Sequence, residues 1–143
     1  SVGTPHGFWF EYLGVQSSSH GPQAPISIAY LKNSITRDLL DWTTVNEELY
    51  NNIRIFDTAS ALARGKQTVK RKDGSERIED FVVVWTNQYG PKKTRVFSTT
   101  IGHNNATVAD PRYLDLVTRG VLWATGHLKE DGSPAESYAP FKK

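Results

Sequence analysis

The chain has 143 residues, and its 17 lysine and arginine residues against 15 aspartate and glutamate residues give a formal net charge of +2. So small a charge is not typical of a surface that binds nucleic-acid phosphates, and no apolar run approaches the roughly 18 residues of a membrane-spanning helix, so we expect neither partner. The length fits one domain, and the absence of cysteine excludes disulfides, thiolate nucleophiles and thiolate metal sites.

The N-terminal third is predicted to hold one helix and one clear strand. Four aromatic residues in five positions predict a short buried helix over residues 8–14, ended by a glycine. The serine-rich stretch 17–22, with its Gly-Pro pair, predicts a loop. Alternating apolar and small residues predict a strand over 26–31, and a similar alternation predicts another over 53–57. The pattern between 35 and 52 favours neither helix nor strand.

A β-hairpin is predicted in the middle of the chain. An Asp-Gly pair separates the extended runs 67–72 and 75–84, and such a pair suits a tight turn whose two central residues both have positive φ. The apolar run 81–85 predicts a strand that is covered on both faces. It is expected to pair with residues 95–100 across a Gly-Pro turn.

The strongest helix signal follows these strands. Asp110 is a suitable N-cap and Pro111 a suitable first residue, and the helix is predicted to run to about residue 125, before Gly126. Gly120 within the helix costs about 1 kcal/mol relative to alanine, which indicates that a neighbouring strand comes close there.

The loop between the last strand and this helix carries the first candidate site. In open α/β sheets, ligands bind beyond the carboxyl ends of strands, and His103, Asn104 and Asn105 occupy such a position. An imidazole there can act as an acid, a base or a metal ligand. The alternative is that the two asparagines shape the turn while His103 orders the loop through a backbone hydrogen bond.

Other polar residues give weaker signals. His20, between the serine-rich stretch and Gly-Pro, is expected at a surface or cleft edge. Glu47 and Glu48 are adjacent and should point in different directions, so by themselves they do not form the two-carboxylate pair of a glycosidase. We interpret them as the solvated end of a segment. No His-x-His or His-x-x-x-His pair and no phosphate-binding or dinucleotide-binding motif is present, so we predict neither a metal nor a cofactor.

Several motifs, in order along the chain, resemble the trehalose-utilisation (ThuA-like) family. The segments that carry the resemblance are 10–20, 34–39, 47–50, 95–104, 110–114 and 119–124. They look like the family's segment before a histidine, its Ile-Thr-x-Gly-Leu and Asp-Glu-Leu-Tyr patterns, and its closing strand, Gly-His loop and last helix. Asp38 stands where the pattern usually has glycine.

The resemblance implies an α/β fold, a flavodoxin-like or class I glutamine amidotransferase-like three-layer sandwich that is incomplete at its N-terminus. Residues 1–128 would form the C-terminal part of the ThuA-like domain, and 129–143 an extended or disordered tail. The first parallel strands of that domain are missing, and the chain contains no methionine, so we expect a processed product or a piece of a longer protein. An incomplete sheet exposes an edge and an apolar face, which predicts a homo-oligomer or pairing with the missing N-terminal half.

The resemblance also implies carbohydrate metabolism, with trehalose, a related disaccharide or a keto-sugar as the small-molecule partner. Amidotransferase chemistry is unsupported because the chain has no cysteine. In one hypothesis His103 is the catalytic acid or base, and His20, Glu48, Asn104 and Trp9 bind the sugar. In the alternative, the domain is a non-catalytic sugar-binding or scaffold module, or an isolated fragment of a larger protein.

Overall fold

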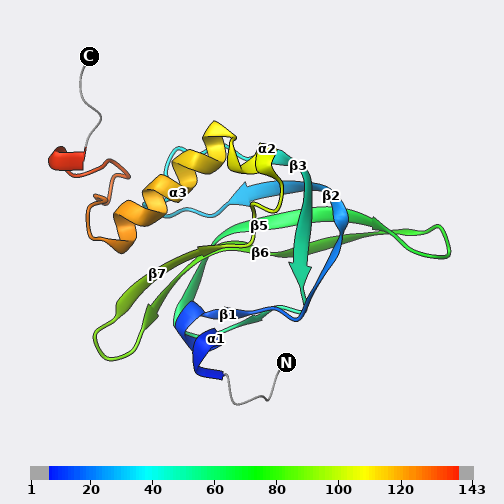
Figure 1. The fold of residues 1–143 in the computed structure, drawn as a ribbon, viewed down its shortest axis with the longest axis horizontal. Coiled ribbons are helices and arrows are strands. Elements are labelled where there is room, and N and C mark those ends of the chain that lie inside the picture. The colour runs from blue at the N-terminus through cyan, green and yellow to red at the C-terminus, as the bar shows by residue number, and fades with distance from the viewer. Residues whose placement is uncertain (1–6, 139–143) are drawn as a thin grey trace.

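A curled five-stranded sheet forms the centre of the protein (Figure 1). The structure is a computed structural model, and it describes residues 7–138. In spatial order the sheet runs β3–β2–β5–β6–β7, and every ladder in it is antiparallel. Its strands are β2 (Ser19–Tyr30), β3 (Trp42–Asn51), β5 (Ala59–Lys70), β6 (Glu76–Tyr89) and β7 (Thr94–Thr99). A separate short ladder pairs β1 (Val15–Gln16) with β4 (Arg54–Ile55).

The helices lie at two places around this sheet (Figure 1). The N-terminal α1 (Gly7–Leu13) contacts β6 and β7, whereas the short α2 (Asn105–Val108) and the longer α3 (Pro111–Ala124) follow the last strand. Leu116 of α3 packs into the larger hydrophobic cluster with buried residues of β2, β3, β5 and β6. A one-turn 3-10 helix, η1 (Glu136–Tyr138), is the last described element. Among residues 7–138 no helix combines the length and the apolar character needed to cross a membrane.

The predicted flavodoxin-like sandwich is not found in residues 7–138. The structure is a mixed strand-and-helix domain in which strands dominate, and its sheet is antiparallel throughout. The reason lies in the connections: short turns join β5 to β6 and β6 to β7, whereas parallel pairing needs a crossover of a dozen or more residues. The loop after β7 therefore leaves an edge strand of an antiparallel sheet, not a strand of an open parallel sheet.

Elements with strong local signals are confirmed. The helix α1 ends before Gly14, which has a φ of 85°, and the central run of β6 is buried between β5 and β7. The helix α3 has Asp110 as its N-cap, with Pro111 as its first residue. A Cβ on Gly120 would lie 2.4 Å from the ring of Phe97 on β7, so a strand does come close at this glycine.

Three predicted features are wrong in detail. Residues 17–22 are not a loop throughout, because Ser19 and His20 pair with β3 and the strand accommodates Gly-Pro through a register shift. The helix α1 is not buried, since Trp9 is 52% exposed. The β5–β6 hairpin forms, but of its two central residues only Gly74 has a positive φ. The Asp73 carboxylate instead accepts hydrogen bonds from the backbone N–H and the hydroxyl of Ser75.

The region without a clear prediction contains a strand, and the strand predicted over 53–57 is shorter than expected. Residues 42–51 form β3 at one edge of the sheet, whereas within 53–57 only Arg54–Ile55 is a strand.

Beyond α3, Leu128 pairs with Pro134 in an isolated bridge, and the rings of His127 and Tyr138 stack with their centroids 4.0 Å apart.

Candidate functional site

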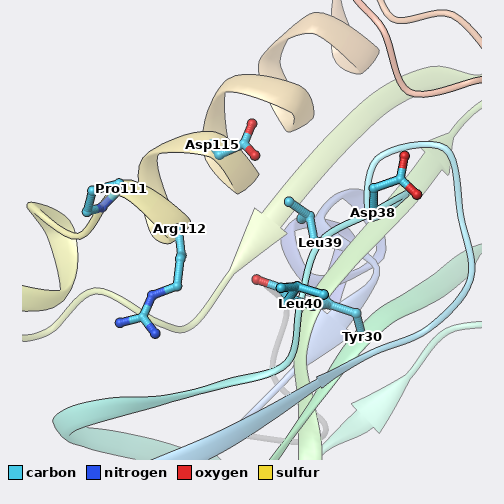
Figure 2. Close-up of a pocket in the computed structure, with 7 residues that line it drawn as sticks. All are labelled: Tyr30, Asp38, Leu39, Leu40, Pro111, Arg112 and Asp115. Atoms are coloured by element: carbon cyan, nitrogen blue, oxygen red, sulfur yellow. The ribbon is translucent and has the colours of Figure 1, made fainter.

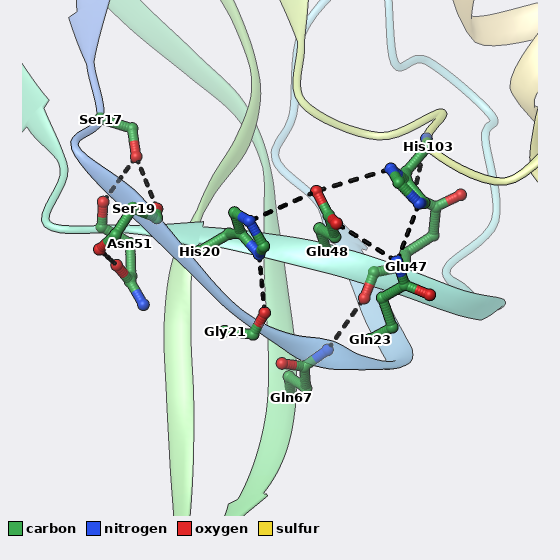
Figure 3. Close-up of polar contacts among 10 residues, drawn as sticks. All are labelled: Ser17, Ser19, His20, Gly21, Gln23, Glu47, Glu48, Asn51, Gln67 and His103. Carbon is green, nitrogen blue, oxygen red and sulfur yellow. Dashed lines mark hydrogen bonds and ion pairs between the residues drawn. The ribbon is translucent and has the colours of Figure 1, made fainter.

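Three of the side chains singled out in the sequence meet on one surface (Figure 3). Oε2 of Glu48 lies 3.8 Å from Nε2 of His20 and 3.6 Å from Nδ1 of His103. The side chains of both histidines are 46% exposed, whereas that of Glu48 is only 12% exposed. Together with Gln23, which contacts Glu48 and His103, these residues are called the imidazole cluster below.

The local geometry of β2 explains how His20 and Gln23 reach the same carboxylate. Residues three apart in a regular strand point to opposite faces of a sheet. The ladder with β3 shifts register between His20 and Gln23, which pair with Tyr50 and Glu48 respectively. This irregularity, a β-bulge at Gly21-Pro22, turns both side chains towards Glu48, and such bulges commonly re-aim side chains next to functional sites.

The contacts of Gln23 determine which ring nitrogen of His103 carries the proton. The amide nitrogen of Gln23 lies 2.9 Å from Nε2 of His103 and donates to Oε1 of Glu48 at 3.3 Å. A donor at that distance requires Nε2 to accept, which puts the proton of the neutral ring on Nδ1. That proton faces the Glu48 carboxylate, which thereby orients the imidazole.

Glu47 holds the Gly-His loop from the other side of β3. Its carboxylate accepts the backbone N–H of His103 at Oε2 and that of Asn104 at Oε1, each at 2.9 Å. Glu47 is 0% exposed, so the interpretation of both glutamates as a solvated segment end is wrong for this residue. The buried charge is compatible with the fold because two charge-assisted hydrogen bonds stabilise it. The expectation that Glu47 and Glu48 point in different directions is confirmed.

Glycine is required beside His103 in this loop. Gly102 has a φ of 123°, and a Cβ there would lie 2.8 Å from the hydroxyl oxygen of Tyr113 on α3. Burial, and secondly the negative charge of Glu47, raise the pKa of the Tyr113 phenol. The phenol therefore stays protonated at neutral pH and packs closely over the backbone of the loop.

A groove of about 640 Å³ leads to His103. Its lining residues are Leu13, Tyr50, Trp85, Phe97, Ser98, Thr99, Thr100, Ile101, Gly102 and His103. The groove thus combines aromatic side chains with a row of hydroxyl-bearing residues at the end of β7. The indole of Trp85 is held in place because its N–H donates to the carbonyl oxygen of Leu13 at 2.8 Å.

A family model described as trehalose utilisation (ThuA) matches residues 2–124, which include the whole imidazole cluster, the groove and α3. The chain belongs to the ThuA family. The resemblance stated from the sequence is therefore confirmed, and membership indicates a role in carbohydrate metabolism. Comparison with curated proteins gave no match, and comparison with solved structures gave none either.

Two of the five residues assigned to the site in the sequence, Asn104 and Trp9, lie outside the imidazole cluster. Asn104 is the N-cap of α2, where its Oδ1 accepts the N–H of Ala106 at 2.9 Å, so this asparagine does shape the turn. Trp9 lies on α1, stacked on Tyr12 with ring centroids 6.1 Å apart, and it does not line the groove.

Sequence reasoning missed Gln23, Tyr50 and the role of Glu47. A signal for Glu47 was the apolar Leu49, because side chains two positions apart in a strand lie on the same face of the sheet. Both side chains are in fact fully buried. Gln23 and Tyr50 gave no comparable signal, since their roles depend on the bulge and on the groove. Within the described part of the chain, no three His, Asp or Glu side chains are placed to hold a metal ion.

A second hollow, of about 330 Å³, lies between the loop after β2 and the first turns of α3 (Figure 2). Its lining residues are Tyr30, Asp38, Leu39, Leu40, Pro111, Arg112 and Asp115, none of which was assigned to the site. Asp38 has a φ of 62°. The turn therefore has the left-handed geometry that suits the glycine of the ThuA-like pattern, and aspartate tolerates it better than most residues.

Proposed function

We propose that the groove binds a disaccharide, either trehalose or a related sugar such as a keto-disaccharide, and that His103 acts on it as a general acid or base. The observation that carries the proposal is the position of His103, which lines a groove with aromatic side chains while its Nδ1 faces Glu48. Membership of the ThuA family supports the carbohydrate class of the ligand.

The groove offers the two kinds of contact that sugars use. The partly exposed rings of Tyr50 and Phe97 offer apolar faces that suit the C–H face of a sugar ring. The hydroxyl group of Ser98 in the groove, and the amide of Gln23 beside His103, suit sugar hydroxyls, because both can donate and accept hydrogen bonds. His20 extends this polar surface on the other side of Glu48.

The proton on Nδ1 defines what His103 contributes. Its Nε2 carries the lone pair, so His103 takes a proton from the substrate there once a substrate group replaces the amide of Gln23. The imidazolium that forms is stabilised by the negative charge of Glu48, which faces the Nδ1 proton. The same imidazolium then returns the proton to the substrate at Nε2.

The second candidate is a sugar-binding module without catalysis. It is favoured by one observation: among the described residues, the imidazole of His103 contacts Gln23 and Glu48 but hydrogen-bonds no serine or threonine hydroxyl, so the cluster contains no activated nucleophile. Under this alternative, His103 and Glu48 act only as hydrogen-bonding groups for the ligand.

Calorimetric binding and turnover assays with trehalose, other disaccharides and their 3-keto derivatives test the proposal. We compare the wild type with His103→Ala and with Lys92→Ala, an exposed control at the β6–β7 turn. If His103 is catalytic, His103→Ala lowers turnover by about 10²–10⁴-fold, while Lys92→Ala behaves as the wild type does. Binding without any turnover by the wild type supports the module, and no binding of any of these sugars overturns both candidates.

A further inference from the structure

Two buried side-chain oxygens behind the bulge of β2 lack a hydrogen-bond donor among the described residues: Oε1 of Gln67 and Oε2 of Glu79. Gln67 is 2% exposed and Glu79 is 7% exposed. The Nε2 of Gln67 donates to the carbonyl oxygens of Ala24 at 3.0 Å and Glu47 at 3.3 Å. These two bonds fix the orientation of the amide, so that its oxygen must face elsewhere (Figure 3).

Both oxygens face the same point, beside Gly21. A Cβ built on Gly21 would lie 3.2 Å from Oε1 of Gln67, 3.7 Å from Oε2 of Glu79 and 3.9 Å from the carbonyl oxygen of Leu49. Apart from atoms of Gly21 and its two neighbours in the chain, these are the three heavy atoms nearest to that point, and all three are oxygens. The absence of a side chain at position 21 therefore leaves space that is bounded by hydrogen-bond acceptors.

Burial makes this arrangement costly without a positively charged or donating group. A buried acceptor without a partner costs about 1–3 kcal/mol, and more when it is charged. Arg77 pairs with the other oxygen of Glu79, so the carboxylate is already partly neutralised. Calcium takes six to eight oxygen ligands, often from several carboxylates, whereas one shared carboxylate and two neutral carbonyls carry too little charge for it.

We propose that a monovalent cation, sodium or potassium, binds beside Gly21 to the side-chain oxygens of Gln67 and Glu79 and to the carbonyl oxygen of Leu49. An open polar groove of about 490 Å³, lined by Glu79, Ser19, Asn51 and Asn52 among others, provides a route of entry. Water in this groove supplies the remaining ligands.

The cation stabilises the bulge that presents the imidazole cluster. Gly21 lies between His20 and Gln23, and its carbonyl oxygen is 2.8 Å from Nδ1 of His20. A cation that joins β2 to β3 and to the β5–β6 hairpin restrains this segment in the geometry that aims both side chains at Glu48. The inference goes beyond the proposed function and does not depend on it, because its test uses no sugar.

The test compares the Tm of the wild type in sodium, potassium and tetramethylammonium chloride at one ionic strength. Tetramethylammonium screens charges similarly but is too large for the space beside Gly21. At a concentration ten times the Kd, the bound cation raises the Tm by about 4 °C over the value in tetramethylammonium. Equal Tm values in the three salts would overturn the proposal and indicate that a water molecule satisfies the oxygens.

Three variants locate the effect. In Glu79→Gln the new amide can donate to Gln67, and in Gly21→Ala the Cβ occupies the space, so each variant should have the same Tm in all three salts. Glu76→Gln is the matched control, because it removes an exposed charge from the same strand and should keep the full difference. If Glu79→Gln and Gly21→Ala also keep the difference in Tm between the salts, the cation binds elsewhere and the proposed site is wrong.

Discussion

Glu47 and Glu48 carry the same functional group, but β3 directs them to opposite environments. Glu47 is fully buried and accepts two backbone N–H groups of the Gly-His loop, whereas Glu48 is partly buried and lies between two half-exposed imidazoles. The first carboxylate therefore positions His103 through its backbone, and the second faces its ring. At the scale of single residues, the site depends on this division of roles.

Replacing Glu47 with glutamine should destabilise the protein by about 2–4 kcal/mol. The amide nitrogen of the new side chain must face one of the two N–H donors, of His103 or Asn104, so one charge-assisted hydrogen bond is lost and two donors oppose each other. Urea denaturation measures the change. Glu48→Gln is the matched control: its partners are half-exposed histidines, so it should cost less than about 1 kcal/mol. Equal effects of the two substitutions would contradict the role given to Glu47.

At the scale of elements, contacts of Asp110 and Arg112 fix the start of α3. Asp110 caps α3 by accepting the N–H of Arg112 at 2.9 Å and forms a two-point ion pair with the same guanidinium. The Arg112 guanidinium also lies 4.5 Å from the centre of the Trp42 ring on β3. One arginine thus joins the start of the helix to the edge of the sheet.

The stability of α3 should fall in acid because of Asp110. Hydrogen bonds from the Arg112 side chain, and secondly from its backbone N–H, lower the pKa of Asp110 from 3.8 to about 2. A carboxyl whose pKa is depressed by folding contributes stability above its unfolded pKa and loses it as the pH falls. We expect this contribution to disappear between pH 4 and pH 2, and Asp110→Asn to lack it. The test is the Tm of the wild type and of Asp110→Asn as a function of pH, together with the carboxyl chemical shift of Asp110 in the wild type. Parallel curves of Tm against pH for the two proteins would show that the prediction is wrong.

Gly120 sets the distance between α3 and β7. Alanine at this position gains about 1 kcal/mol of helix propensity, but its Cβ would overlap the ring of Phe97. Overpacking costs about 1–3 kcal/mol or more, so Gly120→Ala should lower the free energy of unfolding by about 1–2 kcal/mol in denaturant titrations. Thr118→Ala, at an exposed position of the same helix, should not lower the free energy of unfolding. Adding Phe97→Leu should restore part of the loss, and no recovery would argue against this contact.

The whole molecule exposes apolar side chains on its long helix and has two open sheet edges. Leu114 is 49% exposed and Val121 is 55% exposed, and two helical turns place them on the same side of α3. Within residues 7–138, the edge strands β3 and β7 each pair with a single strand of the sheet. Exposed apolar surface and free edges both favour association.

We therefore expect the chain to form homo-oligomers in solution. Sedimentation velocity should give a mass that rises with concentration above the 16.0 kDa of one chain. The double variant Leu114→Glu, Val121→Glu should shift the distribution of oligomeric states to the monomer, whereas Thr118→Ala should leave that distribution unchanged. A wild type that remains at 16.0 kDa at the highest accessible concentration would contradict the expectation.

What could be read directly from the sequence was local. The caps of α3, the close approach at Gly120, the β5–β6 hairpin and the buried run of β6 depend on residues near one another in the chain, and each was predicted. Family-like motifs also selected His20, Glu48 and His103. Tertiary structure decided the antiparallel order of the strands, the burial of Glu47 and the meeting of Gln23 with His103, which are 80 positions apart. Caps and turns are encoded by a few neighbouring side chains, whereas strand pairing and burial depend on the free energy of contacts between distant segments, which no short pattern contains.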